Sequence, residues 1–252
     1  MSSEKGKHIE TLQGHKIPSE PTPFCNTLST DEIETDEITT QRANRTKVMV
    51  VVPMHESCQA EANASIVPFC MVNAERYNLN YLAVKAMPIA AARNFAVQSA
   101  LDSKVDYVLF IDSDMIPYPD FLPKLLSHNK DVITGLCFRK TPPFLPTVYK
   151  ATNGILKSIP IKDIPKKGII EIDACGAAFL LVNTRVFKVV ESPWFDSRGG
   201  LGSGEDINFC KKVKAAKIDI WVDPEVEVGH IGAISNRALH EAFINAYSQN
   251  ET

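Results

Sequence analysis

Apolar and polar positions follow one another in blocks along this chain, and the blocks predict strands and helices in turn. The apolar run VMVVVP at 48–53 ends in proline, which is typical of a strand buried on both faces of a parallel sheet. Because strands alternate with helices, the pattern predicts an α/β fold with a mostly parallel sheet flanked by helices. The other predicted strands are 81–84, 106–114, 131–138, one or two within 168–182, and 217–223, and the predicted helices are 90–103, 119–128 and 205–216.

Two segments depart from this pattern. Residues 1–46 contain the polar, acidic run LSTDEIETDEITTQ, which cannot bury enough apolar surface to offset the entropy cost of ordering it. We therefore expect 1–46 to be a flexible, disordered N-terminal extension and 47–252 to be a single domain. Residues 141–170 contain five prolines, and we expect loops and short hairpins there.

Net charge argues against binding by a diffuse electrostatic field. The chain has 27 basic and 30 acidic residues, of which 5 and 8 lie in residues 1–46, so 47–252 carries 22 of each sign. A neutral body lacks the positive field that attracts nucleic-acid backbone or anionic lipid, so we expect recognition by a few local groups. A nucleic-acid acceptor is therefore disfavoured by charge.

Cysteine spacing and hydropathy set further limits. The six cysteines form no C-x-x-C pair and lack the dense spacing of a disulfide scaffold, so neither a zinc knuckle nor a disulfide framework is indicated. The first residues lack the apolar segment of a signal peptide, and no stretch approaches the roughly 20 apolar residues of a membrane span. These features predict a soluble, cytoplasmic protein.

An acidic pair follows the predicted strand that ends in LFI. Asp112 and Asp114, with Ser113 between them, fall at the carboxyl end of this strand, where open α/β sheets bind their ligands. Alternation along an extended chain would point both carboxylates to one side. Two such carboxylates repel each other unless a cation lies between them, and oxygen ligands favour Mg²⁺ or Mn²⁺. The alternative is a polar turn that only caps the next segment.

An arginine lies in the apolar helix that precedes the acidic strand. Arg93 and its neighbour Asn94 are surrounded in sequence by alanine, phenylalanine and valine. Arg93 could donate to a phosphate or carboxylate of a ligand, or it could form a structural pair with a neighbouring acid. Its position matters because loops that follow neighbouring strands converge at one sheet edge.

A glycine-rich segment precedes the predicted helix 205–216. Glycines at 199, 200, 202 and 204 suggest a loop, and Glu205 and Asp206 follow at the start of the helix. The two acids could serve catalysis, but Ser203 and Asp206 also match a capping box. Trp194 and Phe195, just upstream, could belong to the core or form a platform for a sugar face.

A late histidine follows the strand-like segment PEVEVGH. A lone histidine is often a hydrogen-bonded structural residue. As a third ligand beside two carboxylates, however, the neutral imidazole of His230 would suit Mn²⁺.

In order, these pieces resemble a GT-A glycosyltransferase of the family-2 type, within the nucleotide-diphospho-sugar transferase superfamily. The resemblance spans about 47–232, and its ordered set is more specific than any single motif. The pieces are VVVP, AARNFAVQSAL, FIDSD, GEDINFC and VGH.

The resemblance implies a Rossmann-like GT-A sheet and transfer of a sugar from a nucleoside-diphosphate sugar to an acceptor hydroxyl. It assigns donor binding to the helix 90–103 and to the ends of the strands 48–53 and 106–114. It assigns a metal site to the acidic pair and the histidine. The acids at the start of the helix 205–216 would supply the general base. The residues that it implies for donor binding are Pro53, Met54, His55, Glu56, Arg93, Asn94, Asp112 and Ser113. Those for Mn²⁺ or Mg²⁺ are Asp112, Asp114 and His230. Asp206 is the implied general base, and Glu205 is the second choice.

The implied chemistry is coherent with these residue types. A metal would stabilise charge growing on the departing diphosphate, with help from Arg93. A carboxylate on the opposite face of the sugar would take the proton of the attacking hydroxyl, so that direct displacement inverts the anomeric centre. A retaining transferase of the same fold and a nonenzymatic binding module for sugars or nucleotide sugars are the alternatives.

Other classes fit less well. A HAD-type phosphatase carries its acidic pair on the first strand, followed by Thr or Val, whereas Met115 follows here. A sugar nucleotidyltransferase needs a glycine-rich, basic loop after the first strand, and PMHESCQAE supplies neither feature. The Q-x-x-R-W helix of processive polysaccharide synthases is also missing from the sequence. The acceptor stays open among a glycan, a lipid-linked sugar, a protein and a modified nucleobase.

Overall fold

The computed structural model describes residues 44–55, 57–197, 204–232 and 237–248. These residues lie in a compact unit that spans 41–252. None of the helices that they form is both long enough and apolar enough to cross a membrane.

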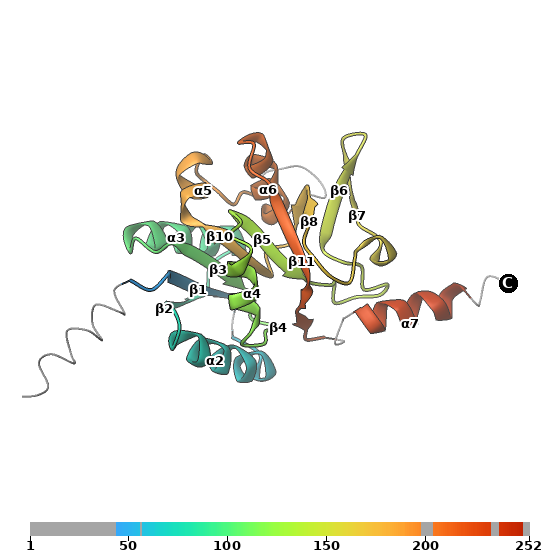
Figure 1. The fold of residues 1–252 in the computed structure, drawn as a ribbon, viewed down its shortest axis with the longest axis horizontal. Helices are drawn as coiled ribbons and strands as arrows, with labels where there is room; N and C mark the ends of the chain where they lie inside the picture. The colour runs from blue at the N-terminus through green and yellow to red at the C-terminus, as the bar shows by residue number, and fades with distance from the viewer. Residues whose placement is uncertain (1–43, 56, 198–203, 233–236, 249–252) are drawn as a thin grey trace, which may run out of the picture. The chain divides into compact units, whose positions relative to one another are not determined.

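A seven-stranded sheet is the centre of this unit (Figure 1). Its strand order is β2-β1-β3-β10-β5-β11-β8, and β10 and β8 run opposite to the other five. The strands are β1 (Lys47–Met54), β2 (Asn78–Lys85), β3 (Tyr107–Ile111), β5 (Val132–Leu136), β8 (Ile170–Ile172), β10 (Phe179–Asn183) and β11 (Ile220–Glu227). The expected mostly parallel α/β sheet is confirmed.

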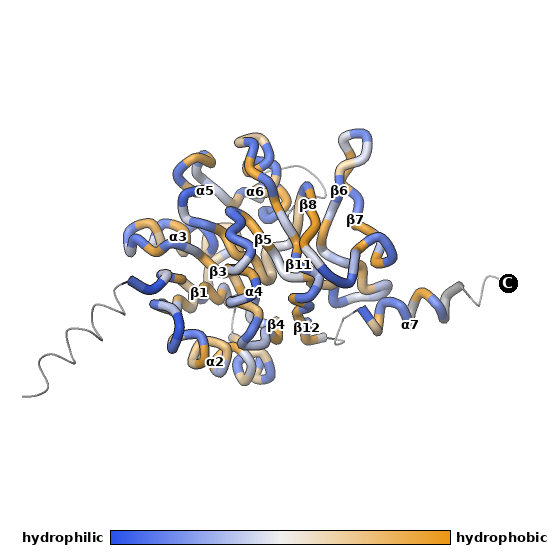
Figure 2. The backbone as a smooth tube through the Cα atoms, viewed as in Figure 1, coloured by the Kyte–Doolittle hydropathy of each residue, from blue (hydrophilic) through white to orange (hydrophobic). Residues whose placement is uncertain are grey.

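Helices cover both faces of the sheet. The side chains of β1 alternate between two cores, because Met49 and Val51 face one layer while Val48 and Val50 face the other. Figure 2 shows the hydrophobic stretches that run through these strands. The first core is covered by α3 (Ile89–Asp102), α5 (Thr184–Val189) and α6 (Glu205–Ala215), and the second by α2 (Ala60–Ala74) and α4 (Phe121–Ser127).

Two small sheets complete the unit. One contains β6 (Val148–Thr152), β7 (Ile155–Ser158) and β9 (Ala174–Cys175), and the 3-10 helix η1 (Ile161–Asp163) follows β7. The hairpin β6–β7 confirms the expected short hairpin within 141–170. The other small sheet pairs β4 (Met115–Ile116) with β12 (Gly229–His230), and it ties the late histidine to the segment after β3.

The sequence reasoning missed several elements. Helix α2 and helix α7 (Arg237–Ser248) were not predicted, and 168–182 contains three strands instead of one or two. The predicted strand 106–114 ends at Ile111, because the chain turns there and Met115 N donates to Asp112 O at 3.0 Å. The expected extended alternation of Asp112 and Asp114 is therefore wrong.

Candidate active site

Arg93 joins two carboxylates from different parts of the fold. It lies in α3 with 2% of its surface exposed. Its Nη2 donates to Asp112 Oδ1 at 2.7 Å, and its Nη1 donates to Glu205 Oε1. A buried guanidinium is tolerated when it is paired and hydrogen-bonded in this way. The pairing brings the end of β3 and the start of α6 together beside α3.

Burial and neighbouring charges shift the pKa values of this cluster. Burial would lower the pKa of Arg93, but Asp112, Glu205 and Asp206 raise it above its usual range. Burial raises the pKa of Asp112; Arg93 opposes this, while Asp114 reinforces it. The pKa of Glu205 is also raised, by burial and by Asp206, against the effect of Arg93. An added cation would therefore be favoured here.

Asp206 lies next to this cluster at the first turn of α6. Its Oδ1 accepts a hydrogen bond from Ile207 N at 2.7 Å. A β-carbon placed on Gly176 would lie 3.6 Å from Asp206 Oδ2, so the carboxylate faces the end of β9. The N-cap of α6 is Gly204, so the capping box expected with Ser203 is not the cap observed, and Ser203 lies outside the described residues.

Asp114 is held by a second set of groups. Lys140 forms an ion pair with its Oδ2, and His230 Nε2 lies 3.4 Å from its Oδ1. Ile231 N donates to Asp114 O at 2.8 Å, so the backbone beside β12 fixes this arrangement. Burial would raise the pKa of Asp114, but His230 and Lys140 outweigh burial and lower it.

The hydrogen bond made by Nδ1 of His230 determines whether Nε2 carries a proton in the neutral ring. Nδ1 lies 2.8 Å from Phe138 O, and because a carbonyl only accepts, Nδ1 carries the proton of this bond. In the neutral ring, the Nε2 lone pair then faces a carboxylate, which is favourable only if a cation lies between them. Burial alone would lower the pKa of His230, but the bonds to Asp114 and Phe138 raise it.

Asp114 and His230 thus fit two positions of a divalent metal site, and Asp112 lies close enough for its charge to interact with Asp114. Carboxylate oxygen and imidazole nitrogen suit Mn²⁺. Within the described ranges, however, no three His, Cys, Asp or Glu side chains are already gathered around one ion position. A metal would have to draw Asp112 and Asp114 together and take the place of Lys140.

Of the remaining expected donor-binding residues, Pro53, His55 and Ser113 lie at the ends of β1 and β3, which are neighbours in the sheet. Pro53 is buried near the end of β1, which runs parallel to β3, and His55 is exposed just beyond it. Glu56 lies outside the described residues. The carbonyl of Ser113 accepts hydrogen bonds from Gln59 N at 3.1 Å and Cys58 Sγ at 3.3 Å.

Asn94 and the aromatic pair have structural contacts. Asn94 Nδ2 donates to Phe195 O at 2.7 Å, and Phe195 N donates to Asn94 Oδ1 at 3.0 Å. Phe195 is 1% exposed and stacks on Phe209 with 4.6 Å between ring centroids. Trp194 is also buried, and its indole nitrogen donates to Phe187 O. Both aromatic residues belong to the core, so the sugar-platform interpretation is wrong.

Sequence reasoning missed Lys140. It follows β5, whose carboxyl end lies at the same edge as that of β3, because both strands point the same way. The sequence did carry a signal: a lysine follows the predicted strand 131–138, and ligands of open α/β sheets bind beyond the carboxyl ends of such strands. Lys140 lies directly before the proline-rich segment 141–170, for which only loops and short hairpins were predicted.

Comparison with known proteins gives a sequence match in the first half of the domain. Residues 61–150 match the Anp1 family model. The mannan polymerase complex subunit mnn9 of Schizosaccharomyces pombe (strain 972 / ATCC 24843) is 35% identical over 68 residues, which are 27% of this chain and 20% of that protein. The chain thus matches about a fifth of the length of this relative.

One of the similar solved structures supports the fold. A197 from STIV is similar with a TM-score of 0.54 and 21% identity, over 74% of this chain and 86% of that one. An apo UDP-glucose pyrophosphorylase has a TM-score of 0.42 and 12% identity, over 87% of each chain. The expected α/β fold with a mostly parallel sheet flanked by helices is confirmed.

Proposed function

We propose that this site transfers a sugar from a nucleoside-diphosphate sugar to an acceptor hydroxyl with the help of a divalent metal ion. The observation that carries the proposal is the convergence of Arg93, Asp112 and Glu205, with Asp114 and His230 beside them, at one edge of the sheet. The sequence match to the Anp1 family supports the same class of reaction.

Asp112, Asp114 and His230 would hold Mn²⁺ or Mg²⁺. The metal would stabilise the negative charge that develops on the departing diphosphate. Lys140 pairs with Oδ2 of Asp114, so an ion bound to that oxygen would displace its ammonium. Its ammonium, on an exposed side chain, is then free to turn toward the diphosphate.

In this proposal, Arg93 is first of all a positioning residue. Both of its terminal nitrogens already donate, one to Asp112 and one to Glu205. Direct contact with the donor would use one of the remaining N–H groups, because each terminal nitrogen carries two and Nε has no partner among the described residues. Its charge stays in the site in either arrangement, so it favours the anionic leaving group.

Asp206 is the proposed general base. Glu205 is engaged in an ion pair with the guanidinium of Arg93, so its carboxylate is not free to approach an acceptor hydroxyl. Asp206 faces Gly176, where even a β-carbon would lie 3.6 Å from its Oδ2, so no side chain of residue 176 covers the carboxylate. Proton removal from an acceptor hydroxyl by Asp206 during direct displacement would invert the anomeric centre.

The test is a panel of nucleotide sugars assayed with and without Mn²⁺. A mannosyl nucleotide is the first donor to try, because the matched relative is a subunit of a mannan polymerase complex. We expect metal-dependent release of the nucleoside diphosphate from one donor, and loss of that release in Asp114→Ala with folding intact. Donor binding without turnover, across a wide range of acceptors, would instead identify a binding module. Analysis of the product anomer decides between inversion and retention.

A further inference from the structure

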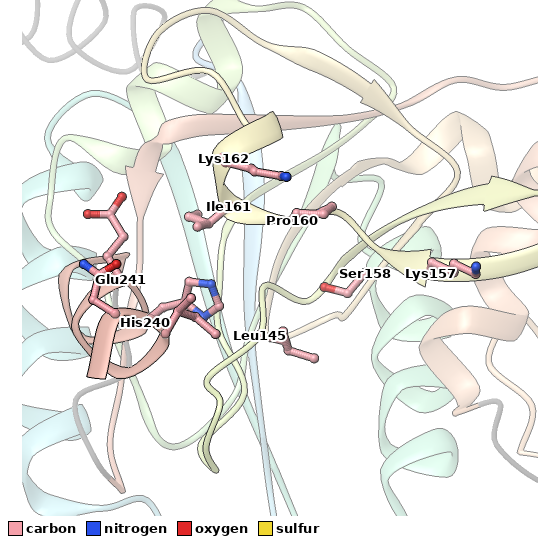
Figure 3. A pocket seen from close by; sticks show the side chains of 10 residues that line it. Leu145, Lys157, Ser158, Pro160, Ile161, Lys162, His240 and Glu241 are labelled. Atoms are coloured by element: carbon pink, nitrogen blue, oxygen red, sulfur yellow. The ribbon is translucent and has the colours of Figure 1, made fainter. Parts of the chain in front are cut away.

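A cavity of about 820 Å³ lies between α7 and the segment that contains β7 and η1. Figure 3 shows the side chains around it, with those of α7 on one side and Lys157 on the other. A volume of this size is typical of sites for small molecules. The lining residues are Leu145, Lys157, Ser158, Pro160, Ile161, Lys162, His240, Glu241, Ile244 and Asn245.

The loop 137–147 contributes to both the cavity and the candidate active site, because Leu145 lines the cavity and Lys140 contacts Asp114. The segment 137–147 sends Lys140 to Asp114. In the same segment, Pro143 O accepts a hydrogen bond from His240 Nδ1 at 2.7 Å. Phe138 also reaches both places, because its carbonyl accepts from His230 and its ring lies 6.4 Å from that of His240. The cavity is therefore connected to the site through one short loop.

Most of the lining is apolar. Leu145, Pro160, Ile161 and Ile244 supply hydrocarbon surface, and Ile244 is 40% exposed although it lines a concave space. Hydrophobic and hydrophilic stretches alternate along α7 in Figure 2, as expected for a helix with one apolar face. Apolar surface exposed in a concave site is characteristic of ligand binding.

Charge is distributed unevenly around the cavity. Lys157 and Lys162 line the side formed by β7 and η1, whereas Glu241 lies on α7. Neither lysine forms an ion pair with a carboxylate in the part of the chain that the structure describes. Two cations beside an apolar space complement an anionic group attached to a hydrocarbon chain.

Two polar groups of the lining are already engaged within the protein. Ser158 Oγ already donates to Pro146 O at 2.7 Å, and His240 Nδ1 is used by Pro143. We propose that this cavity binds an amphiphile with one apolar chain and an anionic head group. The chain lies against Leu145, Ile161 and Ile244, and the head group binds Lys157 and Lys162. This inference does not depend on sugar transfer.

Isothermal titration with decyl phosphate, at concentrations below micelle formation, tests the proposal. We expect binding of one molecule per chain, tighter than binding of decanol or inorganic phosphate, each of which supplies only half of the ligand. Decanoate in a parallel titration distinguishes a carboxylate from a phosphate head group. Absence of saturable binding of both decyl phosphate and decanoate overturns the proposal.

Variants locate the binding. Ile244→Glu should weaken decyl phosphate binding by at least about tenfold, because it adds a carboxylate to the apolar wall. Ile155→Glu is the matched control: Ile155 is 62% exposed at the start of β7 and does not line the cavity, so binding should not change. The double variant Lys157→Gln, Lys162→Gln should lose the preference for decyl phosphate over decanol.

Equal affinity of the wild type and Ile244→Glu for decyl phosphate would contradict this location. Thermal unfolding of each variant verifies that it is folded. Donor binding is measured on the same samples with a nucleotide sugar and Mn²⁺. Amphiphile binding and the proposed sugar transfer are thereby tested separately. If the wild type binds decyl phosphate but no nucleotide sugar, the proposed function fails while this inference stands.

Discussion

Arg93 Nη2 lies 2.7 Å from Asp112 Oδ1, although one residue belongs to α3 and the other follows β3. The same guanidinium donates to Glu205, 112 positions farther along the chain. One buried cation thus fixes the relative positions of two acids that local sequence could not have joined.

Replacement of Arg93 by methionine should destabilise the fold. The variant leaves Asp112 and Glu205 without their shared cation, and breaking a buried pair costs about 3–5 kcal/mol. Urea unfolding measures the loss. Arg76→Met, at an exposed position, is the control and should stay within about 0.5 kcal/mol of the wild type. A loss no larger than that of the control would show that the pairing contributes little.

Asp206→Asn tests the proposed base. The substitution keeps shape but removes basicity, so we expect turnover to fall by about 10²-fold or more while donor affinity stays nearly unchanged. Steady-state kinetics and donor titration measure the two quantities. Asp219→Asn, an exposed acid just after α6, serves as the control. Weaker donor binding with normal turnover would identify Asp206 as a donor ligand.

Lys140→Met should raise the affinity for Mn²⁺. The ammonium of Lys140 competes with a metal ion for Asp114, so its removal eliminates a competitor. Titration of Mn²⁺ followed by electron paramagnetic resonance measures binding without any assay of activity. Lys150→Met, which removes a lysine that pairs with Asp173 instead, should leave the titration unchanged. Unaltered Mn²⁺ affinity in Lys140→Met would argue that the ion, if bound, does not use Asp114.

His230→Ala should have the opposite effect on the same titration. Loss of the imidazole removes one proposed ligand, and we expect Mn²⁺ affinity to fall by about tenfold or more. His128→Ala is the matched control, because His128 contacts Asp223 rather than the candidate site. If both variants bind Mn²⁺ as the wild type does, the role of His230 is structural.

The missed helix α2 shows where sequence patterns fail. Helix α2 has an outer face that exposes Val67, Met71 and Val72, so its apolar residues do not follow the period of an amphipathic helix. Pro68, inside the helix, is also a residue that normally argues against one. The strands β4 and β12 contain two residues each, which is too short for any period to be visible.

The predicted orientation of the acidic pair was wrong for a different reason. Period-two alternation applies only while the chain is extended, and the chain turns directly after Ile111. Asp112 consequently contacts Arg93, whereas Asp114 contacts Lys140 and His230. The sequence therefore located the two acids correctly but could not assign their partners.

The sequence by itself determined the α/β alternation and the acids at the end of β3, because hydrophobic periodicity reports local backbone conformation and burial. Tertiary structure alone decided that Arg93 bridges Asp112 and Glu205 and that β12 brings His230 to Asp114. Such pairings depend on how helices and strands pack across the sheet, and distances between residues far apart in the chain are set by that packing rather than by any local pattern.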